Sequence, residues 1–82
     1  MNEKEAFEVV RSYLVEQFDV PEDKISLEAN LFEELELDSI DALDMVGLLE
    51  ARLGVQVDED ELKKIRKVGD VVTYVVRHAP SA

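Results

Sequence analysis

The sequence has no cysteine and no tryptophan, and it has a single histidine. Without cysteine, the chain has no disulfide framework, no thiolate metal site and no thiol nucleophile. No apolar run reaches the roughly 20 residues that a membrane-spanning helix needs. The polar first residues, from Asn2 to Glu5, do not resemble a signal peptide. We therefore expect a cytoplasmic protein that is not inserted into membranes.

Positive charge is also scarce, with nine lysines and arginines against 20 aspartates and glutamates, and the net charge is −11. This balance disfavours nucleic acids and anionic membranes, because phosphate binding requires a basic surface. It favours protein partners with basic surfaces, although the acids could simply keep a small domain in solution. No base occurs between Lys24 and Arg52. The acids of that base-free stretch are Glu28, Glu33, Glu34, Glu36, Asp38, Asp41, Asp44 and Glu50.

The apolar share of 46% in 82 residues predicts one domain, spanning residues 1–82, with a small core. Helical spacing of apolar residues predicts helices from about 3 to 18, about 39 to 53, a short one from 58, and about 70 to 77. The valines of the last segment favour a strand on propensity, but their spacing favours a helix. We expect an all-α four-helix bundle with a long first loop and a short third helix. The tail from about residue 79 is expected to fray.

The helix expected at residues 39–53 has clear signals at both ends. Asp38 is a good N-cap, Asp41 completes a capping-box pattern, and Gly54 is a natural stop. Gly47 in its middle costs roughly 1 kcal/mol relative to alanine, so it must serve close packing or an open surface. The expected buried stripe is Leu43, Val46, Leu49 and Leu53, with Ile40 and Met45 at its edges.

Catalytic and metal-binding patterns are weak. His78 has no nucleophile nearby in the sequence, and a cation at a helix C-terminus is the simpler interpretation. The acidic stretches do not satisfy the ligand pattern of an EF-hand loop, so we expect no catalytic residue and no dedicated metal site. A basic run could bind phosphate, but a solvated face that neutralises the acids of residues 58–61 is the favoured interpretation. This run comprises Lys63, Lys64, Arg66 and Lys67.

Ser39 stands directly after the expected N-cap. A serine at the start of a helix is usually the capping residue itself. Because Asp38 is the better cap, the Ser39 hydroxyl is free to point outward. A phosphate ester there would lie at a helix N-terminus, which favours an anion. No neighbouring base could activate the hydroxyl, so any chemistry on Ser39 must be performed by another protein.

The stretch "LFEELELDSIDALDMVGLLEARLGVQVDEDELKKIRKVGDVVTYV" resembles the acyl carrier proteins, and the resemblance extends from about residue 7 to 76. It implies a four-helix bundle in which Ser39, beside Asp38, receives 4′-phosphopantetheine from coenzyme A. A separate, magnesium-dependent phosphopantetheinyl transferase would catalyse this step. The thiol of the arm would then hold acyl groups as thioesters for fatty-acid, polyketide-like or modified-lipid biosynthetic enzymes. The chain itself would be a non-catalytic monomer.

The resemblance also implies two surfaces. The residues that contact the basic surfaces of partner enzymes would be Asp38, Ile40, Asp41, Asp44 and Glu50. A cavity for the acyl chain would be lined by Leu31, Val46, Leu49, Val57, Leu62, Ile65 and Val71. Several residues depart from the family pattern, and these departures suggest a specialised member. They are Glu36 (in place of a common glycine), Gly47, Ala51, Arg52 and the basic run. Two alternatives stay open, namely an aminoacyl or peptidyl carrier and an unmodified acidic interaction module.

Overall fold

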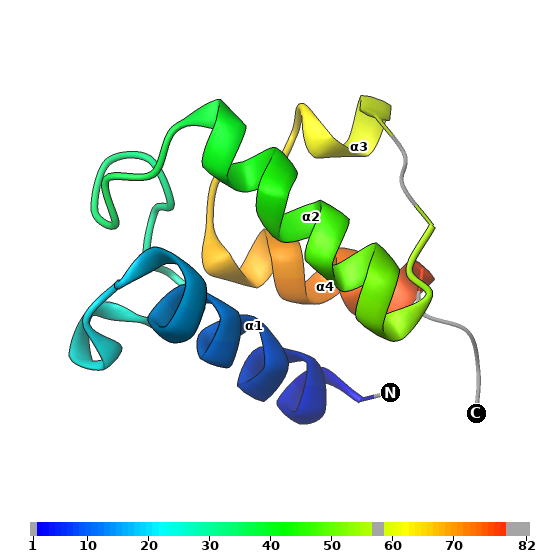
Figure 1. Cartoon of the computed structure of the whole chain (residues 1–82), viewed down its shortest axis with the longest axis horizontal. Coiled ribbons are helices and arrows are strands. Elements are labelled where there is room, and N and C mark those ends of the chain that lie inside the picture. The colour runs from blue at the N-terminus through cyan, green and yellow to red at the C-terminus, as the bar shows by residue number, and fades with distance from the viewer. Residues whose placement is uncertain (1, 57–58, 79–82) are drawn as a thin grey trace.

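The computed structural model describes residues 2–56 and 59–78, and the expected fraying tail lies outside them. Within these residues the elements are α1 (Glu3–Phe18), the 3-10 helix η1 (Glu22–Lys24), α2 (Ser39–Leu53), α3 (Glu59–Leu62) and α4 (Val68–His78). Figure 1 shows α2 passing in front of α4 and α1 lying beneath them, with short α3 at the periphery and the long α1–α2 loop at the opposite side. In the part described, this confirms the all-α bundle with a long first loop and a short third helix.

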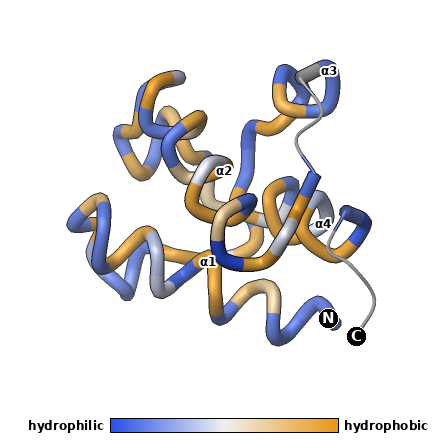
Figure 2. The backbone as a smooth tube through the Cα atoms, turned by 45° about the vertical axis from the view of Figure 1, so that its right-hand side comes forward, coloured by the Kyte–Doolittle hydropathy of each residue, from blue (hydrophilic) through white to orange (hydrophobic). Residues whose placement is uncertain are grey.

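The core forms where α1, α2 and α4 come together, and their hydrophobic residues gather there (Figure 2). The buried residues of the three helices are Ala6, Val10, Tyr13, Leu14, Met45, Val46, Leu49, Val68, Val71, Val72, Tyr74 and Val75. The valines of α4 therefore follow the helical spacing that the sequence indicated, because burial on a helix face outweighs their preference for strands.

The predicted buried stripe of α2 was wrong about the burial of two residues. Met45 is fully buried, whereas Leu43 is 59% exposed. At 3.6 residues per turn, Met45, Val46 and Leu49 share one face, and Leu43 projects roughly 110° from the centre of that face. Leu43 is therefore turned away from the interior that α1 and α4 share with α2.

The first turn of α2 is fixed by a reciprocal cap. Asp38 Oδ1 accepts a hydrogen bond from Asp41 N at 2.9 Å, and Asp41 Oδ2 accepts one from Asp38 N at 3.3 Å. At the other end, Gly54 adopts a φ of 69° and donates to Glu50 O at 3.0 Å. The capping box and the glycine stop predicted from the sequence are both confirmed.

The loop that leads to α2 is pinned to the start of α4. Leu31 N donates to Arg66 O at 2.8 Å, and Gly69 N donates to Leu27 O at 2.8 Å. A Cβ at position 69 would lie 2.8 Å from Leu27 O, so only glycine fits this approach. The buried side chains of the loop are Val20, Ile25, Ala29, Leu31, Leu35 and Leu37. These contacts hold the chain in place directly before Ser39.

Glu36 carries a local strain that a substitution can measure. Its φ of 58° lies in the left-handed region, which costs a residue with a Cβ about 1–2 kcal/mol. Glycine avoids this cost but makes the unfolded chain more flexible, by about 0.4–1 kcal/mol. Glu36→Gly is therefore expected to raise the free energy of unfolding in urea by about 0.5–1 kcal/mol. Glu36→Gln keeps the backbone strain and removes the charge, so equal stabilisation by Gln and Gly would contradict this explanation.

Candidate functional site

Ser39 is the first residue of α2, and its side chain is exposed. Asp38 supplies the cap to the helix, so the Ser39 hydroxyl is not needed for it. Within the described part of the chain, this hydroxyl makes no hydrogen bond. The first turn of a helix leaves backbone N–H groups without helical partners, and its positive end attracts an anion. The hydroxyl is therefore accessible, unengaged and placed where a phosphate ester is favoured.

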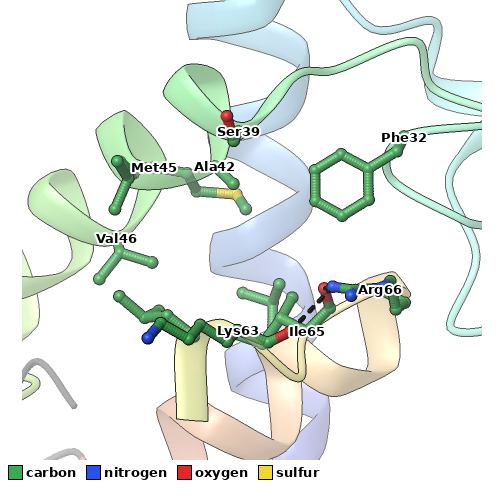
Figure 3. A pocket seen from close by; sticks show the side chains of 11 residues that line it. Phe32, Ser39, Ala42, Met45, Val46, Lys63, Ile65 and Arg66 are labelled. Carbon is green, nitrogen blue, oxygen red and sulfur yellow. Dashed lines mark hydrogen bonds between the residues drawn. The ribbon is translucent and has the colours of Figure 1, made fainter. Parts of the chain in front are cut away.

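A pocket of about 390 Å³ opens beside Ser39. Figure 3 shows Ser39, Ala42, Met45 and Val46 on the α2 side and the segment with Lys63, Ile65 and Arg66 on the opposite side, with Phe32 between them. The lining residues are Phe32, Ser39, Ala42, Leu43, Met45, Val46, Leu62, Lys63, Ile65, Arg66 and Val71. The wall is mostly apolar, with two cations at its edge.

The pocket includes only part of the cavity lining expected from the resemblance. It brings together Val46, Leu62, Ile65 and Val71. Leu31 and Leu49 are fully buried in the core and do not line it, and Val57 lies outside the described residues.

Sequence reasoning missed several lining residues. Leu43 could have been found from its angular position on α2. Phe32 comes from the loop, and its place depends on how the loop folds, which local spacing does not reveal. For the two cations of the lining, Lys63 and Arg66, the sequence favours a solvated face over phosphate binding and does not indicate that they lie beside Ser39.

The outer face of α2 combines acids with exposed apolar side chains. Asp44 and Glu50 are exposed, and Ile40 and Leu43 are 66% and 59% exposed. Asp38 and Asp41 lie at the start of the helix, where they form the capping box. Nothing lies within 4 Å of the position that a Cβ of Gly47 would take. Of the two explanations for this glycine, the open surface is therefore the one that the structure supports.

His78 joins α4 to α3. Its Nε2 lies 2.5 Å from Glu61 Oε2, and its ring stacks on Tyr74 at a centroid distance of 4.4 Å. The Tyr74 hydroxyl donates to Gln56 O at 2.5 Å, and Arg77 lies 3.6 Å from Glu61. His78 is not among the residues that line the pocket beside Ser39. Its contacts are therefore those of a residue that holds the end of the bundle together.

None of the helices in the described residues is both long enough and apolar enough to span a bilayer. In the same residues, no group of three or more His, Cys, Asp or Glu side chains is arranged to hold a metal ion.

Comparisons with known proteins agree with this geometry. Residues 8–75 match the family model described as "Phosphopantetheine attachment site". Acyl carrier protein 2 of Ralstonia nicotianae is 43% identical over 75 residues, which cover 92% of this chain and 93% of that protein. The acyl carrier protein of Lactobacillus acidophilus is 35% identical over 78 residues, which cover 95% and 98%.

Solved structures give the same answer. The crystal structure of an acyl carrier protein from Thermotoga maritima superimposes with a TM-score of 0.81 at 28% identity, covering 95% of this chain and 91% of that one. The acyl carrier protein of Enterococcus faecalis gives a TM-score of 0.78 at 28% identity, covering 96% and 100%. With its exposed serine at the start of an acidic helix, the chain belongs to the acyl carrier proteins, the family that carries acyl groups on a covalently attached 4′-phosphopantetheine arm.

Proposed function

We propose that Ser39 Oγ is the atom to which the phosphopantetheine arm is attached. The observation that carries this proposal is the free, exposed hydroxyl at the first turn of α2, beside an aspartate that already caps the helix. Ser12, in the middle of α1, and Ser26, in the loop, are also exposed. Neither of them lies at a helix N-terminus or beside the pocket.

The residues around Ser39 fit the chemistry of attachment. The positive end of α2 stabilises the negative charge of the phosphodiester that forms on Oγ. The hydroxyl proton must leave as Oγ bonds to phosphorus and the pyrophosphate of coenzyme A breaks to release 3′,5′-ADP, and no described side chain makes a hydrogen bond to the hydroxyl to accept that proton. The base therefore belongs to the transferase, and this chain acts as a non-catalytic carrier. When bound, the arm supplies the thiol that holds the acyl group as a thioester.

The partners of the family are a phosphopantetheinyl transferase and acyl-handling enzymes, and we propose that they dock on the outer face of α2 through basic surfaces. Asp38, Asp41, Asp44 and Glu50 provide negative charge there, and Ile40 provides an apolar contact. Charged contacts of this kind give fast, specific and short-lived association. We further propose that the chain works as a cytoplasmic monomer and as a single domain.

Arg52 is exposed near the end of α2, and its side chain extends toward α1. Its guanidinium lies 5.9 Å from the centroid of the Tyr13 ring of α1, at a distance where a cation–π contact is favourable. The other two departures on α2 from the family pattern, Gly47 and Ala51, are exposed as well. We propose fatty-acid, polyketide-like and modified-lipid pathways as candidates on equal terms, since these departures do not choose between them.

The pocket beside Ser39 is the proposed place for an acyl chain. Of the residues expected to line this cavity, Val46, Leu62, Ile65 and Val71 do so. Burial of the acyl chain against them contributes roughly 0.8 kcal/mol per methylene group, so acylation should raise the melting temperature. Ala42→Phe places a ring in the pocket and is expected to abolish this gain for an octanoyl chain. Ala51→Phe, on an exposed part of α2, is the control, and an equal loss in both variants would contradict the assignment.

The carrier role is tested against the unmodified interaction module by intact mass. The apo chain is incubated with coenzyme A, magnesium and a broad-specificity phosphopantetheinyl transferase. A gain of the phosphopantetheine mass supports the carrier, and an unchanged mass under conditions that load a known carrier rules it out. An aminoacyl carrier would load equally well, and it is distinguished by whether an adenylating enzyme or an acyl-handling enzyme charges the holo form.

A further inference from the structure

The structure divides the basic run into two pairs. Lys63 and Arg66 line the pocket that Ser39 also lines, and they lie on the side opposite α2 (Figure 3). Lys64 and Lys67 are exposed but are not among the lining residues. In a chain with a net charge of −11, two cations at the edge of an otherwise apolar pocket require an explanation.

The Arg66 guanidinium is held in place from two sides. Its Nη1 donates to Lys63 O at 3.0 Å and to Ile65 O at 2.9 Å. Its central carbon lies 5.9 Å from the centroid of the Phe32 ring, a second residue of the pocket wall. A guanidinium has five N–H donors, so those on Nη2 and Nε remain. These two nitrogens form a planar fork that matches the two oxygens of a carboxylate.

The two cations are not used to neutralise described acids. In the described part of the chain, neither Lys63 nor Arg66 forms an ion pair with a carboxylate. Glu61 pairs instead with Arg77 and His78. The Asp70 carboxylate accepts hydrogen bonds from the backbone N–H groups of Arg66 and Lys67. The basic run is therefore more than a neutralising surface at these two positions.

The rest of the pocket defines the other part of the ligand. Met45, Val46, Leu62, Ile65 and Val71 form an apolar wall between Ser39 and the two cations. A ligand that fits both features has an apolar stem and an anionic end. An acyl chain that carries a terminal carboxylate and starts from an arm on Ser39 has this chemistry.

We propose that this carrier binds a carboxylated acyl cargo in the pocket, with the carboxylate held by the Arg66 fork and by Lys63. The inference rests on the proposed attachment of the arm at Ser39, and it names the class of cargo. The surrounding acids would repel an anionic cargo, so the two cations supply the attraction that such a cargo needs.

The test compares two cargoes of equal carbon number. The transferase moves glutaryl- or pentanoyl-phosphopantetheine from the corresponding coenzyme A thioester to Ser39 Oγ and releases 3′,5′-ADP. Melting temperatures are then measured at low salt for the two acyl forms and for the form with the bare arm. We expect the glutaryl form of the wild-type chain to melt about 4 °C or more above the pentanoyl form, as one or more added charge-assisted hydrogen bonds would produce in a domain of this size.

Variants assign the effect to the two cations. Arg66→Gln and Lys63→Gln are each expected to reduce the difference between glutaryl and pentanoyl forms, and the double variant to abolish it. Lys64→Gln and Lys67→Gln make the same charge change in the same segment and should keep the difference. Arg66→Lys retains the charge but loses the fork, and this variant should keep only part of the difference in melting temperature. Circular dichroism of each apo variant shows that it is folded.

Other outcomes would overturn the proposal. Equal melting temperatures of the two acyl forms in the wild type would show that the carboxylate is not bound. The same loss in the Lys64 and Lys67 variants would show a general charge effect. If Arg66→Gln lowers the melting temperature of the bare-arm form as much as that of the glutaryl form, the cations bind the phosphodiester of the arm and not the carboxylate. Failure to load any form would overturn the attachment at Ser39 instead, which intact mass detects before any melting experiment.

Discussion

The Ser39→Ala variant is expected to gain no phosphopantetheine mass in the presence of coenzyme A and a transferase, and to unfold at the same temperature as the wild type. The loss is complete because the proposed attachment needs the Oγ atom. Folding is preserved because the cap of α2 comes from Asp38 and Asp41, not from Ser39.

A matched control is available for this experiment. Ser12→Ala removes an exposed hydroxyl from α1 and should leave modification at the wild-type rate. Intact mass spectrometry measures loading, and thermal unfolding followed by circular dichroism measures stability. A phosphopantetheine mass on the Ser39→Ala variant would place the attachment site elsewhere.

Charge reversal on the outer face of α2 should have the next largest effect. The double variant Asp44→Lys with Glu50→Lys is expected to lower the initial rate of modification at low salt about tenfold or more, because both carboxylates are exposed and belong to the face proposed to steer a basic partner. The deficit should shrink as ionic strength rises and screens the charges. Asp38 and Asp41 are unsuitable for reversal, since loss of the cap alone costs about 0.5–2 kcal/mol.

The control for this variant carries the same change in net charge at other sites. Glu16, on α1, and Glu28, in the loop, are exposed, and the described residues show no hydrogen bond or ion pair for either side chain. The double variant Glu16→Lys with Glu28→Lys should be modified at close to the wild-type rate. Equal slowing in both double variants would mean that net charge, not the outer face of α2, controls association.

The sequence predicted those parts of the fold that local signals determine. The bounds of α1 and α2 agree with the structure, because capping residues and the helical period are read from neighbouring positions. α4 begins at Val68, about two residues before the expected start. The Asp70 carboxylate accepts from the backbone N–H groups of Arg66 and Lys67, and this stabilises the turn before the helix.

Features that depend on packing could not be predicted in the same way. Met45, and not Leu43, is in the core because of the side on which α1 and α4 cover α2. The sequence of a single helix does not reveal that side. The left-handed backbone of Glu36 is set by the loop contacts before α2. The division of the basic run depends on which of its side chains face Phe32 and α2. The cap by Asp38, which leaves the Ser39 hydroxyl free, could be predicted because its signals are local.

The measurement that tests the central claim most directly is the location of the arm on the protein isolated from its native host. The purified chain is digested, and its peptides are fragmented by tandem mass spectrometry under conditions that retain phosphodiesters. We predict that the peptide containing Ser39 carries 4′-phosphopantetheine or an acylated form of it, and that fragment ions place the added mass on Ser39. An unmodified Ser39 in the protein that its host uses, or an arm on any other residue, would contradict the account.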